Sequence, residues 1–274
     1  DYAAALDAAA DLHAPDVLRQ GLRVDHVSFA YPGTSRLVLD DVSLTLPAGA
    51  VVAVVGENGA GKTTLVKLLA KMYEPTSGAI FADETPLARV SANEWRGRLA
   101  GAFQDFFRFE FQARHTVGLG DVARLDEVPA IERAVDRAGA GDVVARLPSG
   151  LETQLGPTWP AGVELSFGQW QKLALARGFM RDHPLLLVLD EPTAALDAET
   201  EHALFEQYAA AARAHGADGR ITILVSHRFS TVRMADLIVV LDGSRLAEVG
   251  SHEELMARGG PYAELYGIQA AAYR

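Results

Sequence analysis

The sequence predicts an α/β fold with an antiparallel β subdomain near the N-terminus and an inserted α-helical subdomain. After residue 50, strand-like and helix-like patterns alternate, as they do in an α/β sheet. Between residues 22 and 46, apolar and polar side chains alternate on both sides of a turn-rich stretch, which predicts antiparallel strands. Residues 105–182 have mostly helical patterns and contain no convincing series of strands.

These patterns divide the chain into four parts. We expect a linker at 1–20, an α/β core with the antiparallel β subdomain at 21–104 and 183–250, the helical subdomain at 105–182, and C-terminal helices at 251–274. Core strands are expected at 51–55, 99–103, 185–189, 221–225 and 237–241. The linker is rich in alanine, and its loosely spaced leucines also allow a short amphipathic helix. Ser251 and Glu254 have the spacing of a capping box, which predicts the start of a helix.

Composition excludes several classes of protein. The chain has 274 residues and no cysteine, so disulfides and thiolate metal sites are ruled out. Its formal net charge of −11, without a stripe of Lys and Arg, argues against a nucleic-acid partner. No apolar run approaches the ~18 residues that cross a bilayer. The chain begins at Asp1 rather than at a methionine, which we take as a sign that it is part of a longer polypeptide.

A glycine-rich loop follows the apolar run at 51–55 and precedes a helical pattern. It consists of Gly56, Glu57, Asn58, Gly59, Ala60, Gly61, Lys62, Thr63 and Thr64. Strand, loop and helix in this order are the context that the phosphate-binding pattern G-x-x-x-x-G-K-[ST] requires. The glycines allow successive N–H groups and the positive end of the helix dipole to face one anion. We expect a nucleoside triphosphate here, with Lys62 on its β and γ phosphates and Thr63 on Mg²⁺; the alternative is an ordinary glycine turn.

A second apolar run, at 185–189, ends in Asp190, Glu191 and Pro192. Such a run predicts a buried parallel strand, and ligands bind at the carboxyl ends of strands of this kind. Asp190 is expected to support Mg²⁺ through water. Glu191 is expected to accept a proton from the attacking water as the general base. The alternative is a strand that ends in a solvated acidic turn.

Residues 165–169 read Leu-Ser-Phe-Gly-Gln, which resembles the signature sequence L-S-G-G-Q of ATP-binding cassette (ABC) proteins. The order of the other motifs is also similar to this family over residues 22–260. The resemblance implies a P-loop NTPase core with a RecA-like mixed sheet, and it implies ATP and Mg²⁺ as ligands. It further implies that Tyr31 stacks on adenine and that Gln104 contacts Mg²⁺ and water. It also implies that Asp197 belongs to the loop after the acidic strand and that His227 contacts the γ-phosphate.

Each of these four residues also has an ordinary structural explanation. Tyr31 suits packing on its hairpin, and Gln104 suits the end of a strand. Asp197 suits the N-cap of a helix, and His227 suits an exposed loop. Their order and spacing relative to the glycine loop and the acidic strand end favour the functional interpretation.

In the family, the signature sequence faces the γ-phosphate that a different cassette binds. Ser166, Gly168 and Gln169 are therefore expected at the nucleotide of a partner, in a head-to-tail dimer that holds two ATP molecules. We expect a helix at 168–181, whose N-terminus and the Ser166 hydroxyl would form an anion site. Phe167 departs from the pattern, because the family has glycine there. It either packs away from the nucleotide, the interpretation we favour, or weakens the signature in an asymmetric pair.

The segments at 226–236 and 250–255 resemble exporter cassettes more than importer ones. In such exporters, including peptide- and drug-exporting half-transporters, a six-helix membrane domain precedes the cassette. Residues 1–20 would then arrive from its last helix, and the cassette would lie at the cytoplasmic face of the membrane. We therefore expect ATP hydrolysis that powers export. An importer ATPase and a soluble, non-transport ABC ATPase are the alternatives.

An aromatic stretch is expected to meet this membrane domain. The resemblance places the contact at residues 104–119, and the rings there are Phe103, Phe106, Phe107, Phe109 and Phe111. Exposed rings in such a group would form a docking patch. The alternative is that they form the core of the helical subdomain.

Overall fold

The computed structural model describes residues 7, 9–103, 105–190, 219–226 and 229–272, with side chains at 229–230 and 270–272 left aside. The chain forms two compact units. The first consists of Asp1–Leu99, Leu185–Val188 and Phe205–Arg274, and the second of Ala100–Pro184 and Leu189–Leu204. The proposed division of the chain into a core, a helical subdomain and terminal segments stays a prediction.

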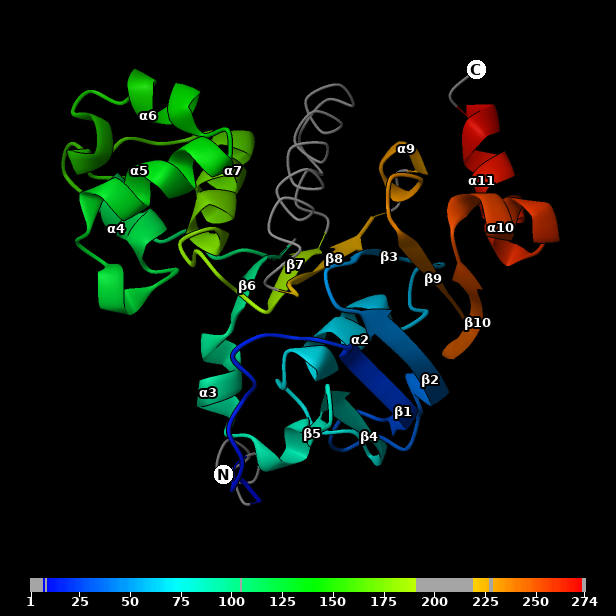
Figure 1. The fold of residues 1–274 in the computed structure, drawn as a ribbon. Coiled ribbons are helices and arrows are strands. Elements are labelled where there is room, and N and C mark those ends of the chain that lie inside the picture. The colour runs from blue at the N-terminus through cyan, green and yellow to red at the C-terminus, as the bar shows by residue number, and fades with distance from the viewer. Residues whose placement is uncertain (1–6, 8, 104, 191–218, 227–228, 273–274) are drawn as a thin grey trace. The chain divides into compact units, whose positions relative to one another are not determined.

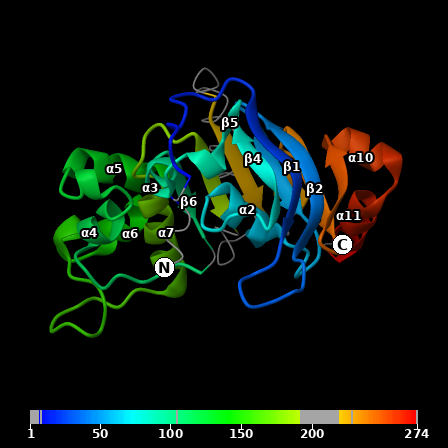
Figure 2. The same cartoon turned by 90° about the horizontal axis from the view of Figure 1, so that it is seen from below.

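A four-stranded sheet confirms the predicted antiparallel strands. It contains β1 (Gly21–Phe29), β2 (Leu39–Pro47), β4 (Ser77–Ala82) and β5 (Thr85–Pro86) in the order β2-β1-β4-β5, which Figure 2 shows in the first unit. Leu22 pairs with Leu46 across β1 and β2, so the inward apolar positions match the predicted alternation. Strand β4 was not predicted, since it opens with Ser77 and Gly78, which break the apolar pattern.

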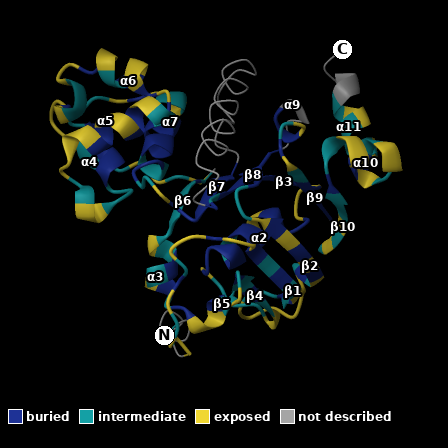
Figure 3. Ribbon diagram, viewed as in Figure 1, coloured by how far each residue is buried: buried dark blue, intermediate teal, exposed yellow. Residues whose placement is uncertain are grey.

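The second sheet is mixed, as expected. Its strands are β3 (Val51–Val55), β6 (Leu99–Ala102), β7 (Leu186–Asp190), β8 (Ile221–Val225), β9 (Leu237–Asp242) and β10 (Arg245–Gly250), in the order β10-β9-β3-β8-β7-β6 (Figure 1). β3 pairs in parallel with β8 and β9, whereas β10 pairs antiparallel with β9. β3, β7 and β8 are buried along their whole length (Figure 3), which explains their continuous apolar sequences.

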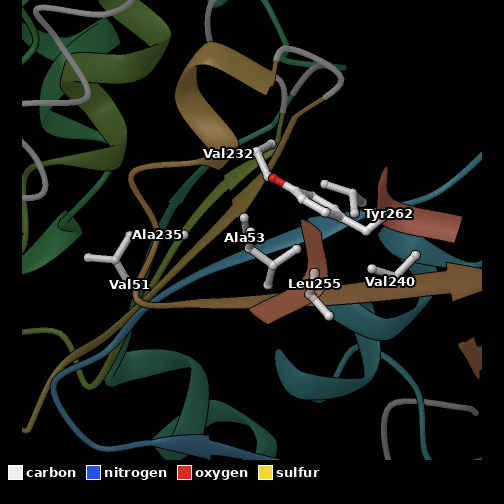
Figure 4. Packing of buried hydrophobic residues seen from close by; sticks show 9 residues of the cluster. Val51, Ala53, Val232, Ala235, Val240, Leu255 and Tyr262 are labelled. Carbon is white, nitrogen blue, oxygen red and sulfur yellow. The ribbon is translucent and has the colours of Figure 1, made fainter. Parts of the chain in front are cut away.

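The first unit also contains short helices. They are α2 (Lys62–Leu69), η1 (Leu87–Arg89), α3 (Ala92–Gly97), α9 (Phe229–Val232), α10 (His252–Arg258) and α11 (Pro261–Ala272). The predicted capping box is present, because Ser251 Oγ accepts from the Glu254 amide at 3.3 Å and the Ser251 amide donates to Glu254 Oε2 at 2.9 Å. It starts α10, whose Leu255 packs with Val51, Val240 and Tyr262 in a buried cluster (Figure 4).

The N-terminal segment is irregular where it is described. Residues 9–20 contain no helix, so the amphipathic helix that we allowed there is absent from this part of the segment. Leu12 instead forms a parallel bridge with Val90, and Leu18 is buried.

The second unit is mostly helical, as the sequence predicted. Its helices are α4 (Ala113–Gly118), η2 (Val122–Arg124), α5 (Val128–Arg137), α6 (Gly141–Arg146), η3 (Gly150–Glu152) and α7 (Phe167–Gly178). The helix that we expected at 168–181 thus begins one residue earlier and ends three residues earlier, because Ser166 is its N-cap and Phe179 its C-cap. Of the helices that the structure describes, none is both long and apolar enough to cross a lipid bilayer.

Candidate nucleotide site

The glycine loop joins β3 to α2 with a backbone that excludes larger side chains. Gly56 has φ 147°, and a Cβ there would lie 2.2 Å from the Leu241 carbonyl oxygen. Gly61 has φ 100°, and a Cβ there would lie 2.7 Å from a methyl carbon of Leu39. Both the positive φ and the close approach require glycine, so the motif is fixed by local geometry as well as by ligand chemistry.

The N-terminus of α2 is built to receive an anion. Its N-cap is Gly61, which has no side chain to accept hydrogen bonds from the amides of the first turn. The positive end of the helix dipole adds to this potential. Lys62 is 7% exposed, and its Nζ donates to the carbonyls of Gly56 at 2.9 Å and Glu57 at 3.0 Å. The ammonium group therefore lies against the carbonyls of the loop, and its contact with phosphate stays a prediction.

The other loop residues divide into exposed and buried ones. Glu57, Asn58, Gly59 and Thr63 are exposed, whereas Ala60 and Thr64 are buried. The first group therefore forms the accessible surface of the loop, and the second group anchors the loop and α2 to the core. Nucleotide contacts by these residues stay predictions.

Tyr31 has both a hydrogen-bond partner and aromatic neighbours. Its hydroxyl lies 3.0 Å from Thr64 Oγ1, so it is tied to the first turn of α2. Its ring packs edge-on against Phe29 at 5.0 Å and Tyr73 at 5.2 Å between centroids. The packing expected for a hairpin aromatic residue is thus present. Stacking on adenine stays a prediction, and the hydrogen bond places Tyr31 beside the same helix that carries Lys62.

Several predicted residues lie outside the described part of the chain. They are Gln104, Glu191, Asp197 and His227. Asp190 is described: it is the last residue of β7, it is 5% exposed, and it belongs to the second unit. The position of this carboxylate at the end of a buried strand agrees with the sequence prediction.

The oxygen donors of Thr63 and Asp190 fit Mg²⁺ chemically. This ion prefers oxygen ligands and commonly takes one or two carboxylates together with the phosphates of a nucleotide. Within the described ranges, no group of three or more His, Cys, Asp and Glu side chains could hold a metal ion. The assignment of Mg²⁺ to Thr63, Gln104 and Asp190 stays a prediction.

The signature segment starts α7 with a capping box. Ser166 Oγ accepts from the Gln169 amide at 3.3 Å, and the Ser166 amide donates to Gln169 Oε1 at 2.9 Å. We did not predict this box, although the spacing Ser-x-x-Gln is a recognised signal for one. Gly168 lies inside the first helical turn rather than before it.

This cap does not prevent Ser166 and Gln169 from binding a phosphate. The Ser166 hydroxyl uses a lone pair to accept from the backbone, whereas its O–H can still donate to an anion. Gln169 likewise uses its carbonyl oxygen in the cap and keeps a donor NH₂ group on the same side chain. The cap therefore orients both donors at the helix N-terminus, where the dipole also favours an anion.

Phe167 is the first residue of α7, and its side chain is 49% exposed. Its backbone is helical, so the ring that replaces the family's glycine causes no strain of the left-handed kind. The ring lies 5.5 Å from that of Phe106, and the guanidinium carbon of Arg108 lies 5.6 Å from its centroid. Neither neighbour could be predicted from the sequence, because no local pattern links residues about 60 positions apart.

The aromatic stretch before α4 is largely accessible. Phe107 is 69% exposed and Phe111 is 45% exposed, while Phe103, Phe106 and Phe109 are intermediate. The alternative that these rings form a buried core is therefore not what the structure shows. Phe107 and Phe111 are thus accessible, and a docking role for them stays a prediction.

Comparison with known proteins decides the family. The family model described as ABC transporter matches residues 39–194, which is more than half of the chain. The chain belongs to the ABC transporter family. The P-loop fold with a mixed sheet is confirmed by the same match and by the structural comparison below.

The relatives of this ABC transporter chain include named exporters. It is 42% identical over 258 residues to an ATP-dependent lipid A-core flippase of Ralstonia nicotianae, covering 93% of this chain and 42% of the relative. It is 41% identical over 252 residues to the flippase of the same name in Cupriavidus pinatubonensis, with 91% and 41% coverage. A solved structure of a bacterial Atm1-family ABC exporter with ATP bound matches at TM-score 0.82 and 35% identity, covering 94% of this chain and 44% of that one. The chain thus spans less than half the length of these relatives.

Proposed function

We propose that this chain is the ATP-binding and ATP-hydrolysing cassette of an ABC exporter, which uses ATP-driven head-to-tail dimerisation to power transport. The observation that carries the proposal is the glycine loop, whose backbone requires glycine at Gly56 and Gly61 and places Lys62 at the start of α2. The family match and the relatives named as flippases or exporters support the choice of exporter over an importer or a soluble ATPase.

The first unit supplies most groups for binding ATP. The amides of the loop and the first turn of α2 would bind the phosphates, together with the ammonium of Lys62. Tyr31 would stack on adenine, held in place by its hydrogen bond to Thr64. Thr63, Gln104 and Asp190 would hold Mg²⁺, which supplies positive charge to the phosphate oxygens when it is bound.

Hydrolysis would follow from in-line attack of water on the γ-phosphorus. Glu191 would accept a proton from this water as the bond to γ-phosphorus forms and the bond to the β–γ bridging oxygen breaks. Lys62 and His227 would stabilise the charge that develops on the phosphate. Ser166, Gly168 and Gln169 of a second cassette would complete the site, with Asp197 at the same interface. One cassette alone would hold ATP but lack these donors.

The cycle of ATP binding and hydrolysis would move a membrane domain. ATP would close the dimer and hydrolysis would release it, and the exposed aromatic stretch around Phe107 and Phe111 would carry this movement to the membrane domain. We place the cassette at the cytoplasmic face of the membrane, where ATP is abundant. The partners are thus ATP, a second cassette in a homodimer or heterodimer, and a membrane domain. No nucleic acid is expected, given the net charge of −11.

Replacing Glu191 with Gln tests this proposal. The variant should bind ATP as the unmodified chain does but hydrolyse it about 10²- to 10⁴-fold more slowly, because the general base is lost. The uncleaved nucleotide should accumulate a dimer that sedimentation can detect. Glu164→Gln is the matched control, because it removes an exposed carboxylate two residues before the signature serine. Unchanged turnover in Glu191→Gln, or solitary molecules at high protein and ATP concentrations, would contradict the proposal.

A further inference from the structure

The loop at residues 105–111 contacts the first turn of the signature helix α7. The ring of Phe106 lies 5.5 Å from the ring of Phe167, with 43° between the two planes. The guanidinium carbon of Arg108 lies 5.6 Å from the centroid of the same ring, within reach of a cation–π interaction. Two groups of the loop therefore hold the side chain at the start of α7.

The same loop is also held at the last turn of α7. Arg177 Nη1 donates to the Phe107 carbonyl at 3.2 Å, and its guanidinium carbon lies 4.8 Å from the centroid of Phe109. Burial lowers the pKa of Arg177 from its usual value, which agrees with a guanidinium packed against the loop. The loop thus lies along α7 and is attached near both ends of the helix.

Phe167 is the part of this attachment that differs from the family pattern. A glycine at the first helical position has no side chain and could make neither the contact with Phe106 nor the one with Arg108. Because its backbone is helical, Phe167 gains these contacts without strain. Its neighbours in sequence are Ser166, whose hydroxyl is a donor at the helix N-terminus, and Gly168.

We propose that Phe167 is a positioning residue, which fixes the start of α7 to the loop at 105–111 and so sets where Ser166 presents its hydroxyl to the ATP of a partner cassette. This inference rests on the proposed function. The loop carries the exposed rings of Phe107 and Phe111, so a movement of the docking patch would reach the signature through Phe106 and Phe167. The substitution of the family's glycine thus strengthens a mechanical link and leaves the phosphate-binding donors in place.

The test measures ATP-driven dimerisation of the full chain in the Glu191→Gln background. Phe167→Ala should weaken the dimer about two- to ten-fold per site, which corresponds to the loss of one aromatic pair. Phe106→Ala should have an effect no larger than this, since it leaves the contact between Arg108 and Phe167 in place. The double variant should be no weaker than Phe167→Ala alone, because Phe167→Ala already removes the contact with Phe106. Phe167→Tyr keeps the ring and should restore dimerisation.

Two further measurements separate positioning from a general loss of structure. The affinity of the monomer for a fluorescent ATP analogue should be unchanged in Phe167→Ala, because the groups expected to bind ATP in the monomer are distinct from the signature. Val122→Ala, which removes an exposed apolar side chain from η2 in the same unit, is the matched control and should leave dimerisation unchanged. The thermal unfolding midpoint of each variant is measured as well, so that a change in analogue binding or dimerisation can be separated from a loss of folded protein.

The outcomes distinguish this inference from the proposed function. If Glu191→Gln alone does not dimerise with ATP, the proposed function fails and this inference with it. If Glu191→Gln dimerises and Phe167→Ala dimerises equally well, the positioning role is overturned while the proposed function stands. Additive effects of Phe106→Ala and Phe167→Ala would also overturn it, since they would mean that the two rings act independently.

Discussion

Helices α2 and α7 both begin at motifs that are expected to bind phosphate, but their first turns are closed differently. At α2 the N-cap is Gly61, in a left-handed conformation and without a side chain. At α7 the N-cap is Ser166, which forms a reciprocal capping box with Gln169. The N-cap side chain therefore stabilises the first turn of α7, whereas no side chain caps the first turn of α2. One site is shaped by backbone conformation and the other by side-chain hydrogen bonds.

This difference explains why the two motifs tolerate substitution differently. The glycine loop cannot accept a Cβ at Gly56 or Gly61, because the backbone has positive φ and neighbouring atoms are too close. The signature accepts a phenylalanine at Phe167, because that residue is already helical and its side chain points to a loop with room for a ring. Departure from a family pattern thus has different consequences at the two helix starts.

The largest effect is expected for Gly56→Ala. The new Cβ would meet the Leu241 carbonyl at 2.2 Å with φ 147°, so the loop must move. We expect a loss of about 3 kcal/mol in the free energy of unfolding, together with loss of ATP binding. Urea unfolding followed by circular dichroism, and equilibrium binding of an ATP analogue, measure the two effects.

Gly168→Ala is the matched change in α7. Gly168 lies within a helix, where alanine is favoured over glycine by about 0.5–1 kcal/mol, so the free energy of unfolding should not fall. If Gly168→Ala destabilised the chain as much as Gly56→Ala, the contrast between the two helix starts would be wrong.

A smaller effect is expected at the cap of α7. Ser166→Ala removes the acceptor for the Gln169 amide and should lower the free energy of unfolding by about 1 kcal/mol. Ser166→Asp should recover most of this stability, because aspartate is a good N-cap. It should not recover ATP-driven dimerisation, since a carboxylate cannot donate to phosphate and repels it. Thermal unfolding and sedimentation with ATP separate the two roles; full dimerisation of Ser166→Asp would show that the hydroxyl donor is dispensable.

The smallest effect concerns the pH dependence of the first unit. His26 Nδ1 lies 2.8 Å from Asp41 Oδ1, and the hydrogen bond to Asp41 raises the pKa of His26 above its usual value of 6.5. The folded-state pKa is the higher one, so this pair stabilises the fold fully below about pH 6.5. Its contribution is lost as the pH rises through the raised value. Both side chains are exposed, so a small shift of the unfolding midpoint is expected, and Asp41→Asn should abolish it.

The stability of the second unit should change in the acid range. Burial acts to raise the pKa of Asp182, but hydrogen bonds from Arg124 and Arg137 outweigh it, so the pKa of this carboxyl is below 3.8. Its stabilising contribution is therefore present above that pH and is lost as the pH falls through the lowered value. An effect of Asp41→Asn that appeared only in acid would contradict the assignment to His26.

Much of the fold could be predicted because it depends on local patterns. The strand expected at 221–225 was found with those bounds, and the antiparallel strands and the Ser251 capping box were also confirmed. The glycine loop was predictable for the same reason, since its positive φ values restrict the sequence directly. Strand β4 was missed because its first residues do not alternate. The capping box at Ser166 was not predicted, even though Ser166 and Gln169 have the spacing that indicates one.

By itself, the sequence determined the family, the order of the core strands along the chain, and the chemical character of the phosphate loop. Each of these depends on residues close together in the chain, where spacing alone decides which groups share a turn or a strand. Only the tertiary structure decided that Tyr31 is tied to Thr64, that Phe167 rests on Phe106 and Arg108, and that Phe107 and Phe111 remain exposed. These contacts join residues far apart in sequence. They arise from tertiary packing, which the periodicity of a single sequence does not predict.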